Sequence, residues 1–131
     1  MIDFVLPQTL GEWLAWLTAF ATLLVGLATM LAPRVFLSFV GLAPVPDRRD
    51  GLSETRSFIG GGTVGLALAV LLLHPQPLLY FALGMTFALM VVGRVLSLIV
   101  DRATGKVAML GLAIEIAAAF FPFAYTFGLI V

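Results

Sequence analysis

Cysteine is absent from this 131-residue sequence, which also holds a single histidine and only 11% charged residues. Without cysteine, the chain can form no disulfide, no thiolate metal site and no cysteine nucleophile. One histidine is too few for the haem or di-metal sites that helical bundles build, so we expect no cofactor and no metal. The formal net charge is zero, which argues against a nucleic-acid partner because such partners require a basic face.

What the sequence does have is apolar residues, which make up 62% of the chain. Soluble domains contain roughly 45–50% apolar residues. A chain of this length is one domain with too little interior to hide so much apolar surface. We therefore expect a lipid bilayer to cover it.

Four apolar stretches are long enough to cross a bilayer, which takes about 20 residues in a helix. They cover about residues 13–32, 56–74, 78–100 and 107–130. The connections after the second and third stretches are short, which makes those neighbours antiparallel. The sequence thus predicts one transmembrane domain over residues 1–131, an all-α, up-down-up-down four-helix bundle. His74, at the end of the second span, is interpreted as an interface residue.

The basic residues predict the orientation of the chain. Lys and Arg fall around the first and third loops and are absent from the amino-terminal segment, the second loop and the carboxyl terminus. The positive-inside rule places those two loops in the cytoplasm and both termini outside. The aromatic residues Trp13, Trp16, Tyr80 and Tyr125 fall near the opposite interface, where such rings prefer to lie. Because the first twelve residues hold no Lys or Arg, we expect no cleavable signal peptide and a retained first span.

Small residues repeat at helical spacing on three spans and predict the packing faces, because transmembrane helices approach closely through small side chains. The second span offers Gly61, Gly65 and Ala69, flanked by Gly60 and Gly62. The corresponding sets are Ala15, Ala19, Thr22, Gly26 and Thr29 on the first span, and Ala108, Gly111, Glu115, Ala118 and Pro122 on the fourth.

Two charged residues interrupt otherwise apolar spans, where such residues are rare and costly. Arg94 lies about seven residues before the end of the third span, and Glu115 about eight residues into the fourth. At 1.5 Å per residue these positions are roughly 10 and 12 Å deep, on antiparallel neighbours. We therefore expect Arg94 and Glu115 to form a direct or water-bridged pair.

A wider polar cluster is predicted around this pair. Ser97 and Asp101 share a helix face with Arg94 by their spacing. Glu54 and Arg56 begin the second span at the same end, and Glu54 is expected to point toward the packed face. Two interpretations stay open: an ion-pair network that fixes the helix register, or a polar floor for a ligand cavity or proton-responsive site.

These motifs also resemble a known family. The stretch Ser53-Glu54-Thr55-Arg56 with Gly60, Gly61 and Gly65, then Gly93-Arg94 with Ser97 and Asp101, then Glu115, is similar to small bacterial four-span membrane proteins of unknown-function family 4345. The resemblance runs from about Trp13 to the end of the chain. It implies a bacterial multi-pass membrane protein and no established activity, with Glu54, Arg56, Arg94, Asp101 and Glu115 as the family-like polar positions. Together with the orientation predicted from the basic residues, we expect an inner-membrane protein with both termini periplasmic.

The function hypotheses follow from what the spans and loops can hold. Short loops leave no room for a catalytic domain, and no serine has a histidine partner at a suitable depth, so we expect no enzyme. The first hypothesis is binding of a hydrophobic molecule, a lipid or a partner membrane subunit. The alternative is a small transporter or proton-coupled channel that uses Glu115 and Arg94. A homo-oligomer is left open.

Overall fold

The computed structural model describes residues 4–73 and 75–131, so the interface position predicted for His74 lies outside the described residues. The described part of the chain is helical and contains no strand. The elements are α1 (Leu10–Leu31), α2 (Pro33–Phe39), α3 (Asp50–Glu54), the π-helical segment η1 (Thr55–Gly61), α4 (Gly62–Leu72), α5 (Pro77–Val100) and α6 (Lys106–Thr126). Because α3, η1 and α4 are continuous, four helices are long and apolar enough to cross a membrane, as predicted.

The helix boundaries have local causes. At the start of α1, the Glu12 amide donates to Thr9 Oγ1 while the Thr9 amide donates to Glu12 Oε2, a reciprocal capping box. Pro33 and Pro77 each occupy the first position of a helix, where a missing N–H costs nothing. The second span begins at Asp50 rather than at about 56, since the polar turn before it continues directly into α3.

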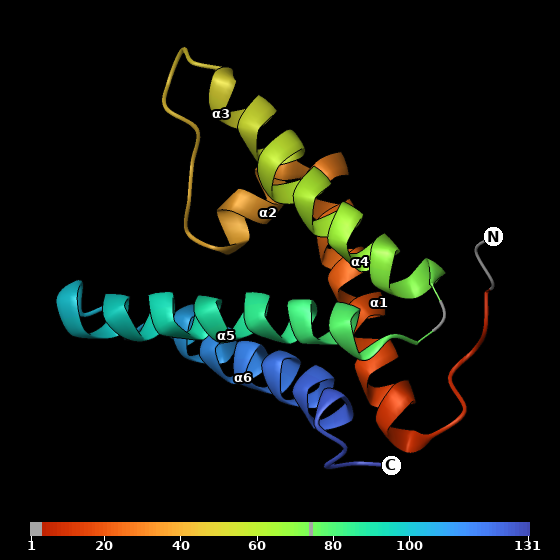
Figure 1. Cartoon of the computed structure of the whole chain (residues 1–131). Coiled ribbons are helices and arrows are strands. Elements are labelled where there is room, and N and C mark those ends of the chain that lie inside the picture. The colour runs from red at the N-terminus through yellow and green to blue at the C-terminus, as the bar shows by residue number, and fades with distance from the viewer. Residues whose placement is uncertain (1–3, 74) are drawn as a thin grey trace.

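The four spans are arranged as two antiparallel hairpins. One hairpin pairs α1 with η1 and α4, and the other pairs α5 with α6. Figure 1 shows the two hairpins meeting near the α4–α5 connection and diverging away from it. The far end of the first hairpin is at α3, and the far end of the second is at the α5–α6 turn. The hairpins touch through α1 with α6 and through α4 with α5. The up-down-up-down connectivity matches the prediction, and the packing between hairpins is concentrated at one end.

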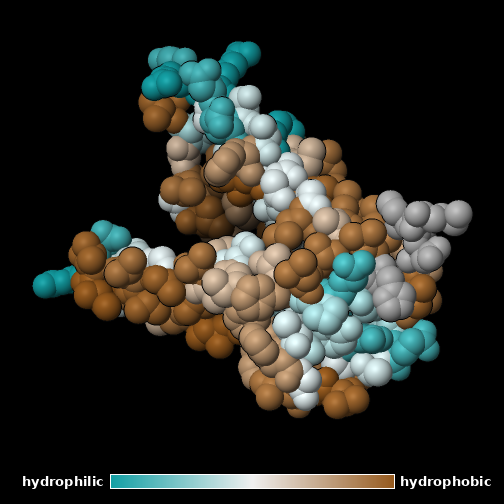
Figure 2. Space-filling view, in the orientation of Figure 1, coloured by the Kyte–Doolittle hydropathy of each residue, from teal (hydrophilic) through white to brown (hydrophobic). Residues whose placement is uncertain are grey.

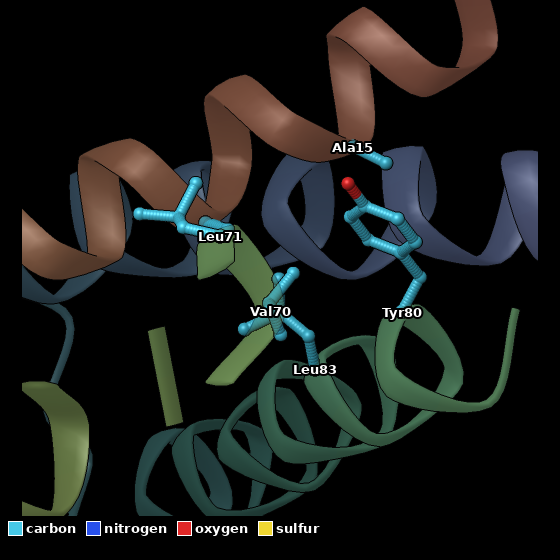
Figure 3. Packing of buried hydrophobic residues seen from close by; sticks show 6 residues of the cluster. Ala15, Val70, Leu71, Tyr80 and Leu83 are labelled. Carbon is cyan, nitrogen blue, oxygen red and sulfur yellow. The ribbon is translucent and has the colours of Figure 1, made fainter. Parts of the chain in front are cut away.

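The hydrophobic core lies where the hairpins meet. It contains Ala15 and Ala19 of α1, Val70 and Leu71 of α4, and Tyr80 and Leu83 of α5. Figure 3 shows Tyr80 and Leu83 on α5 pointing toward Ala15 on α1 and Val70 on α4, respectively. The Tyr80 ring also meets the Tyr125 ring of α6 edge-on, with centroids 5.0 Å apart. The core therefore joins all four spans at this end.

The predicted packing face of the first span is confirmed, because Ala15, Ala19, Thr22, Gly26 and Thr29 are all buried. The threonines Thr22 and Thr29 turn their hydroxyls back to the carbonyls of Thr18 and Val25, so no polar group on this face is left unpaired. The face predicted on the fourth span is also buried or half-buried, from Ala108 to Pro122.

The face predicted on the second span is wrong by one residue. Gly65 and Ala69 are exposed, whereas Gly60 lies against Met30 so closely that a β-carbon there would be 2.6 Å from Met30 Cγ. The cause is η1, because a π-helical turn repeats after five residues instead of three or four. Thr55 and Gly60, five residues apart, are therefore both buried. Glu54, expected to point toward the packed face, is exposed for the same reason.

Candidate functional site

An ion pair joins the two helices of the second hairpin. Arg94 Nε of α5 donates to Glu115 Oε2 of α6 at 2.7 Å, and Arg94 Nη2 donates to Glu115 Oε1. The side chain of Glu115 is 6% exposed and that of Arg94 is 31% exposed. This two-point arrangement matches the fork of the guanidinium to the carboxylate, the strongest geometry available to such a pair. The contact predicted from matched depth is therefore present and direct.

A glycine makes room for this pair. Gly111 lies one helical turn before Glu115 on α6, and a β-carbon at Gly111 would be 2.8 Å from Arg94 Cζ. Any side chain there would displace the guanidinium that Glu115 holds through Nε and Nη2. Gly111, predicted as a packing residue, thus packs against the charged end of Arg94 rather than against a helix backbone.

The exposed side of Arg94 faces a groove of about 310 Å³ between α5 and α6. The walls are mostly small or apolar, and the polar atoms come from three side chains. The lining residues are Met90, Gly93, Arg94, Ser97, Ala103, Ala108 and Glu115. Among the described residues Arg94 Nη1 donates no hydrogen bond, so the guanidinium keeps one edge free. A free donor edge beside apolar walls suits a ligand that carries a hydrogen-bond acceptor on an apolar body.

Arg56 has a different role from the one predicted. Its Nη1 donates to the carbonyl of Met30, and to that of Leu31 at 3.3 Å. These carbonyls belong to the last turn of α1, which ends before Pro33. Helix ends leave carbonyls without helical partners, and a basic side chain can satisfy them. Arg56 therefore caps α1 and ties it to η1.

The two remaining acids of the predicted cluster also lie away from Arg94. Glu54 and Asp101 are exposed, and neither forms an ion pair in the part of the chain that the structure describes. Asp101 is the C-cap of α5, and its amide donates to the Ser97 carbonyl at 2.9 Å. Of the six predicted cluster residues, the structure brings together Arg94, Ser97 and Glu115 and places the other three elsewhere.

Four groove residues were not predicted as site residues. Met90, Gly93, Ala103 and Ala108 line the groove beside the ion pair. Met90 could have been found from its spacing, because it lies one helical turn before Arg94 on the same side of α5. Ala103 lies in the α5–α6 turn and carries no such signal. Across residues 4–73 and 75–131, no group of three or more His, Asp or Glu side chains could hold a metal ion.

The fold and this site define a multi-pass membrane protein of four helical spans with one ion pair inside the second hairpin. The chain belongs to the family described as "Domain of unknown function (DUF4345)", whose model matches residues 11–125. This is the family that the polar and glycine motifs resembled. No curated protein and no solved structure matches the chain.

Proposed function

We propose that this protein binds a hydrophobic molecule, such as a lipid, in the groove between α5 and α6. The proposal is carried by one observation: Arg94, which Glu115 holds through Nε and Nη2 and whose Nη1 makes no hydrogen bond within the described residues, lines a groove of about 310 Å³. An unsatisfied donor at membrane depth is costly, since lipid tails accept no hydrogen bond. A ligand with a carbonyl, ester or hydroxyl oxygen would satisfy it.

The charge of the site favours a ligand head that is polar without being strongly anionic. Glu115 already neutralises Arg94, so the pair carries no net charge. A full negative charge entering the groove would lie near the Glu115 carboxylate as well as near the guanidinium, and it would lose its own hydration. A neutral acceptor gains the hydrogen bond without that penalty.

The surroundings of the groove suit an apolar ligand body. Because the hairpins diverge, the half of α5 that begins at Leu89 packs mainly on α6. Most of the side chains in this half are exposed and would face lipid. Leu89, Val92, Leu96 and Ile99 are each more than half exposed. A ligand tail lying along this surface would replace lipid tails at little cost, while the groove holds its head.

The test blocks the groove without touching the ion pair. A β-carbon at Gly93 meets nothing within 4 Å, so Gly93→Leu places a side chain in the groove while leaving Arg94 and Glu115 in place. Gly62→Leu is the matched control, since Gly62 is also surrounded by open space and lies outside the groove. Hydrophobic molecules retained by the purified protein would be quantified by native mass spectrometry and solvent extraction.

We expect the wild-type protein and Gly62→Leu to retain the same molecule, and Gly93→Leu to lose most of it. Arg94→Gln should lower retention further if the variant folds. Equal retention by the wild type and Gly93→Leu, or no retained molecule in any of them, would refute the proposal.

A small proton-coupled channel or transporter is the second candidate, favoured by the burial of Glu115 inside a span. A buried carboxylate is a typical proton site in membrane transport proteins. Liposomes containing the protein and a pH-sensitive dye test this candidate. It requires proton flux that Glu115→Gln abolishes, whereas the lipid-binding proposal requires none.

A further inference from the structure

A second groove lies at the opposite end of the fold from the core, in the segment between α2 and α3. It encloses about 390 Å³ and includes three arginines among its lining residues, which are Arg34, Pro44, Val45, Pro46, Asp47, Arg48, Arg49 and Leu52. We propose that this groove binds the phosphate headgroup of an anionic phospholipid. The site is independent of the groove at Arg94 and does not rest on the function proposed there.

The charges of this groove favour an anion. Arg48 Nη2 lies 3.3 Å from Asp50 Oδ2, a pair in which both side chains are largely exposed. Arg34 and Arg49 form no ion pair within the described residues. Even with Asp47 and Asp50 both counted against the three arginines, the net charge around the groove is +1. Guanidinium groups match phosphate oxygens by two parallel hydrogen bonds, so an arginine-lined groove suits a phosphate better than a point anion.

The apolar surface next to these arginines identifies the source of the phosphate as a lipid. Val35, Phe39, Leu42 and Val45 belong to α2 and the following loop, and each is more than half exposed. Figure 2 shows hydrophilic residues gathered at the α3 end of the molecule, directly beside hydrophobic surface. A segment with apolar residues on one side and arginines on the other lies at the membrane interface. At that depth the phosphate of a phospholipid lies beside the arginines.

The helices on either side also support a position of the α2–α3 segment at the membrane interface. α1 ends at Leu31, and the continuous helix of the second span begins at Asp50, so the segment joins two spans at the same membrane face. Juxtamembrane basic residues attract anionic lipids in proportion to their number. Here three of the seven basic residues of the chain line a single groove rather than being spread along the surface.

The experiment measures lipid binding by native mass spectrometry of the full chain in detergent, titrated with phosphatidylglycerol or phosphatidylcholine. The test variant is Arg34→Gln with Arg49→Gln. The matched control is Arg102→Gln with Lys106→Gln, which removes the same charge from the other basic loop. We expect the wild type and the control to prefer phosphatidylglycerol, and the test variant to bind it roughly tenfold more weakly, as for a lost charge-assisted contact.

A second variant tests the proposal even where the double substitution impairs folding. Asp47→Asn removes the carboxylate that lines the groove, and Asn tolerates the positive φ of 63° at this residue. This variant should bind phosphatidylglycerol more tightly than the wild type does.

Three results would overturn the proposal. Equal binding of the two lipids would show that the groove does not recognise charge. An equal loss in the test variant and the control would show diffuse attraction to basic loops instead of a site. Glycerol 3-phosphate, added as the free headgroup, is expected to compete only weakly, and competition at the same concentration as the lipid would show that the groove takes a soluble phosphate.

Discussion

Arg94 and Glu115 are the residues whose contact could be predicted from sequence and whose energetic role can be measured directly. Removing one partner leaves the other charge in a low dielectric, which costs about 3–5 kcal/mol for a buried pair. We expect Arg94→Leu and Glu115→Leu each to lower stability substantially, and the double substitution to be more stable than the worse single variant. Thermal unfolding in detergent measures all three. Additive losses from two mild single variants would contradict a coupled pair.

The hydroxyl of Tyr80 is a second testable feature at the scale of one residue. The residue is 1% exposed, and its hydroxyl has no hydrogen-bond partner among the described residues. A buried unsatisfied polar group costs about 1–3 kcal/mol. Tyr80→Phe should therefore leave thermal stability unchanged or raise it, whereas Tyr80→Ala should lower it by about 3–5 kcal/mol through loss of the ring. A clear loss of stability in Tyr80→Phe would reveal a partner for the hydroxyl, such as a buried water.

The single-residue predictions succeeded where they depended on one hairpin alone. Arg94 and Glu115 lie on helices joined by a short turn, so counting residues from that turn gave their depth and their contact. Glu54 and Arg56 depended on how the first hairpin packs on the second, and sequence spacing carries no information on that. Arg56 instead meets the end of its own hairpin partner, α1.

At the scale of an element, η1 explains why the predicted face of the second span was displaced. The run from Thr55 to Gly61 contains two adjacent glycines, and nothing in their order distinguishes a π-helical turn from an α-helical one. The α1 face needed no such correction, because a regular α-helix keeps the three- and four-residue spacing throughout. The length of the apolar stretches thus predicts the spans well. Small-residue spacing predicts which residues of a span face another helix only where the helix is regularly α-helical.

Two glycines of the second span provide a matched test of this register. Gly60 lies against the backbone and side chain of Met30, whereas a β-carbon at Gly65 meets nothing within 4 Å. Gly60→Ala should force α1 and η1 apart and lower stability by about 1–3 kcal/mol, the usual effect of overpacking. Gly65→Ala should be neutral within this chain. Thermal unfolding in detergent measures the stability of both variants. A larger loss in Gly65→Ala than in Gly60→Ala would support packing through the Gly61–Gly65–Ala69 face instead.

At the scale of the whole molecule, the two hairpins share one core at one end and each ends in a basic turn or loop at the other. The end with the shared core, called the closed end here, carries the aromatic residues Trp16, Tyr80 and Tyr125. The diverging ends carry the α2–α3 loop, which contains Arg48 and Arg49, and the α5–α6 turn, which contains Arg102. Both proposed ligand sites therefore lie in the half of the molecule where the two hairpins diverge, away from the shared core.

This division predicts which parts of the chain share a side of the membrane. The start of α1, the α4–α5 connection and the carboxyl terminus lie at the end with the core, and the start of α3 and the α5–α6 turn lie at the diverging ends. By their positions in the chain, Gln8, Gln76 and Val131 belong to the first group and Arg49 and Thr104 to the second, and all five are exposed. Because the chain has no cysteine, a single cysteine at each position can be labelled in intact cells with a membrane-impermeant thiol reagent.

The positive-inside rule predicts that the basic loops lie in the cytoplasm. Gln8→Cys, Gln76→Cys and Val131→Cys should therefore react, and Arg49→Cys and Thr104→Cys should react only after the cells are opened. Because all five residues are exposed in the folded chain, a difference in labelling reports the membrane side. The reverse pattern would invert the topology, and a mixed pattern within either group would contradict the hairpin arrangement itself.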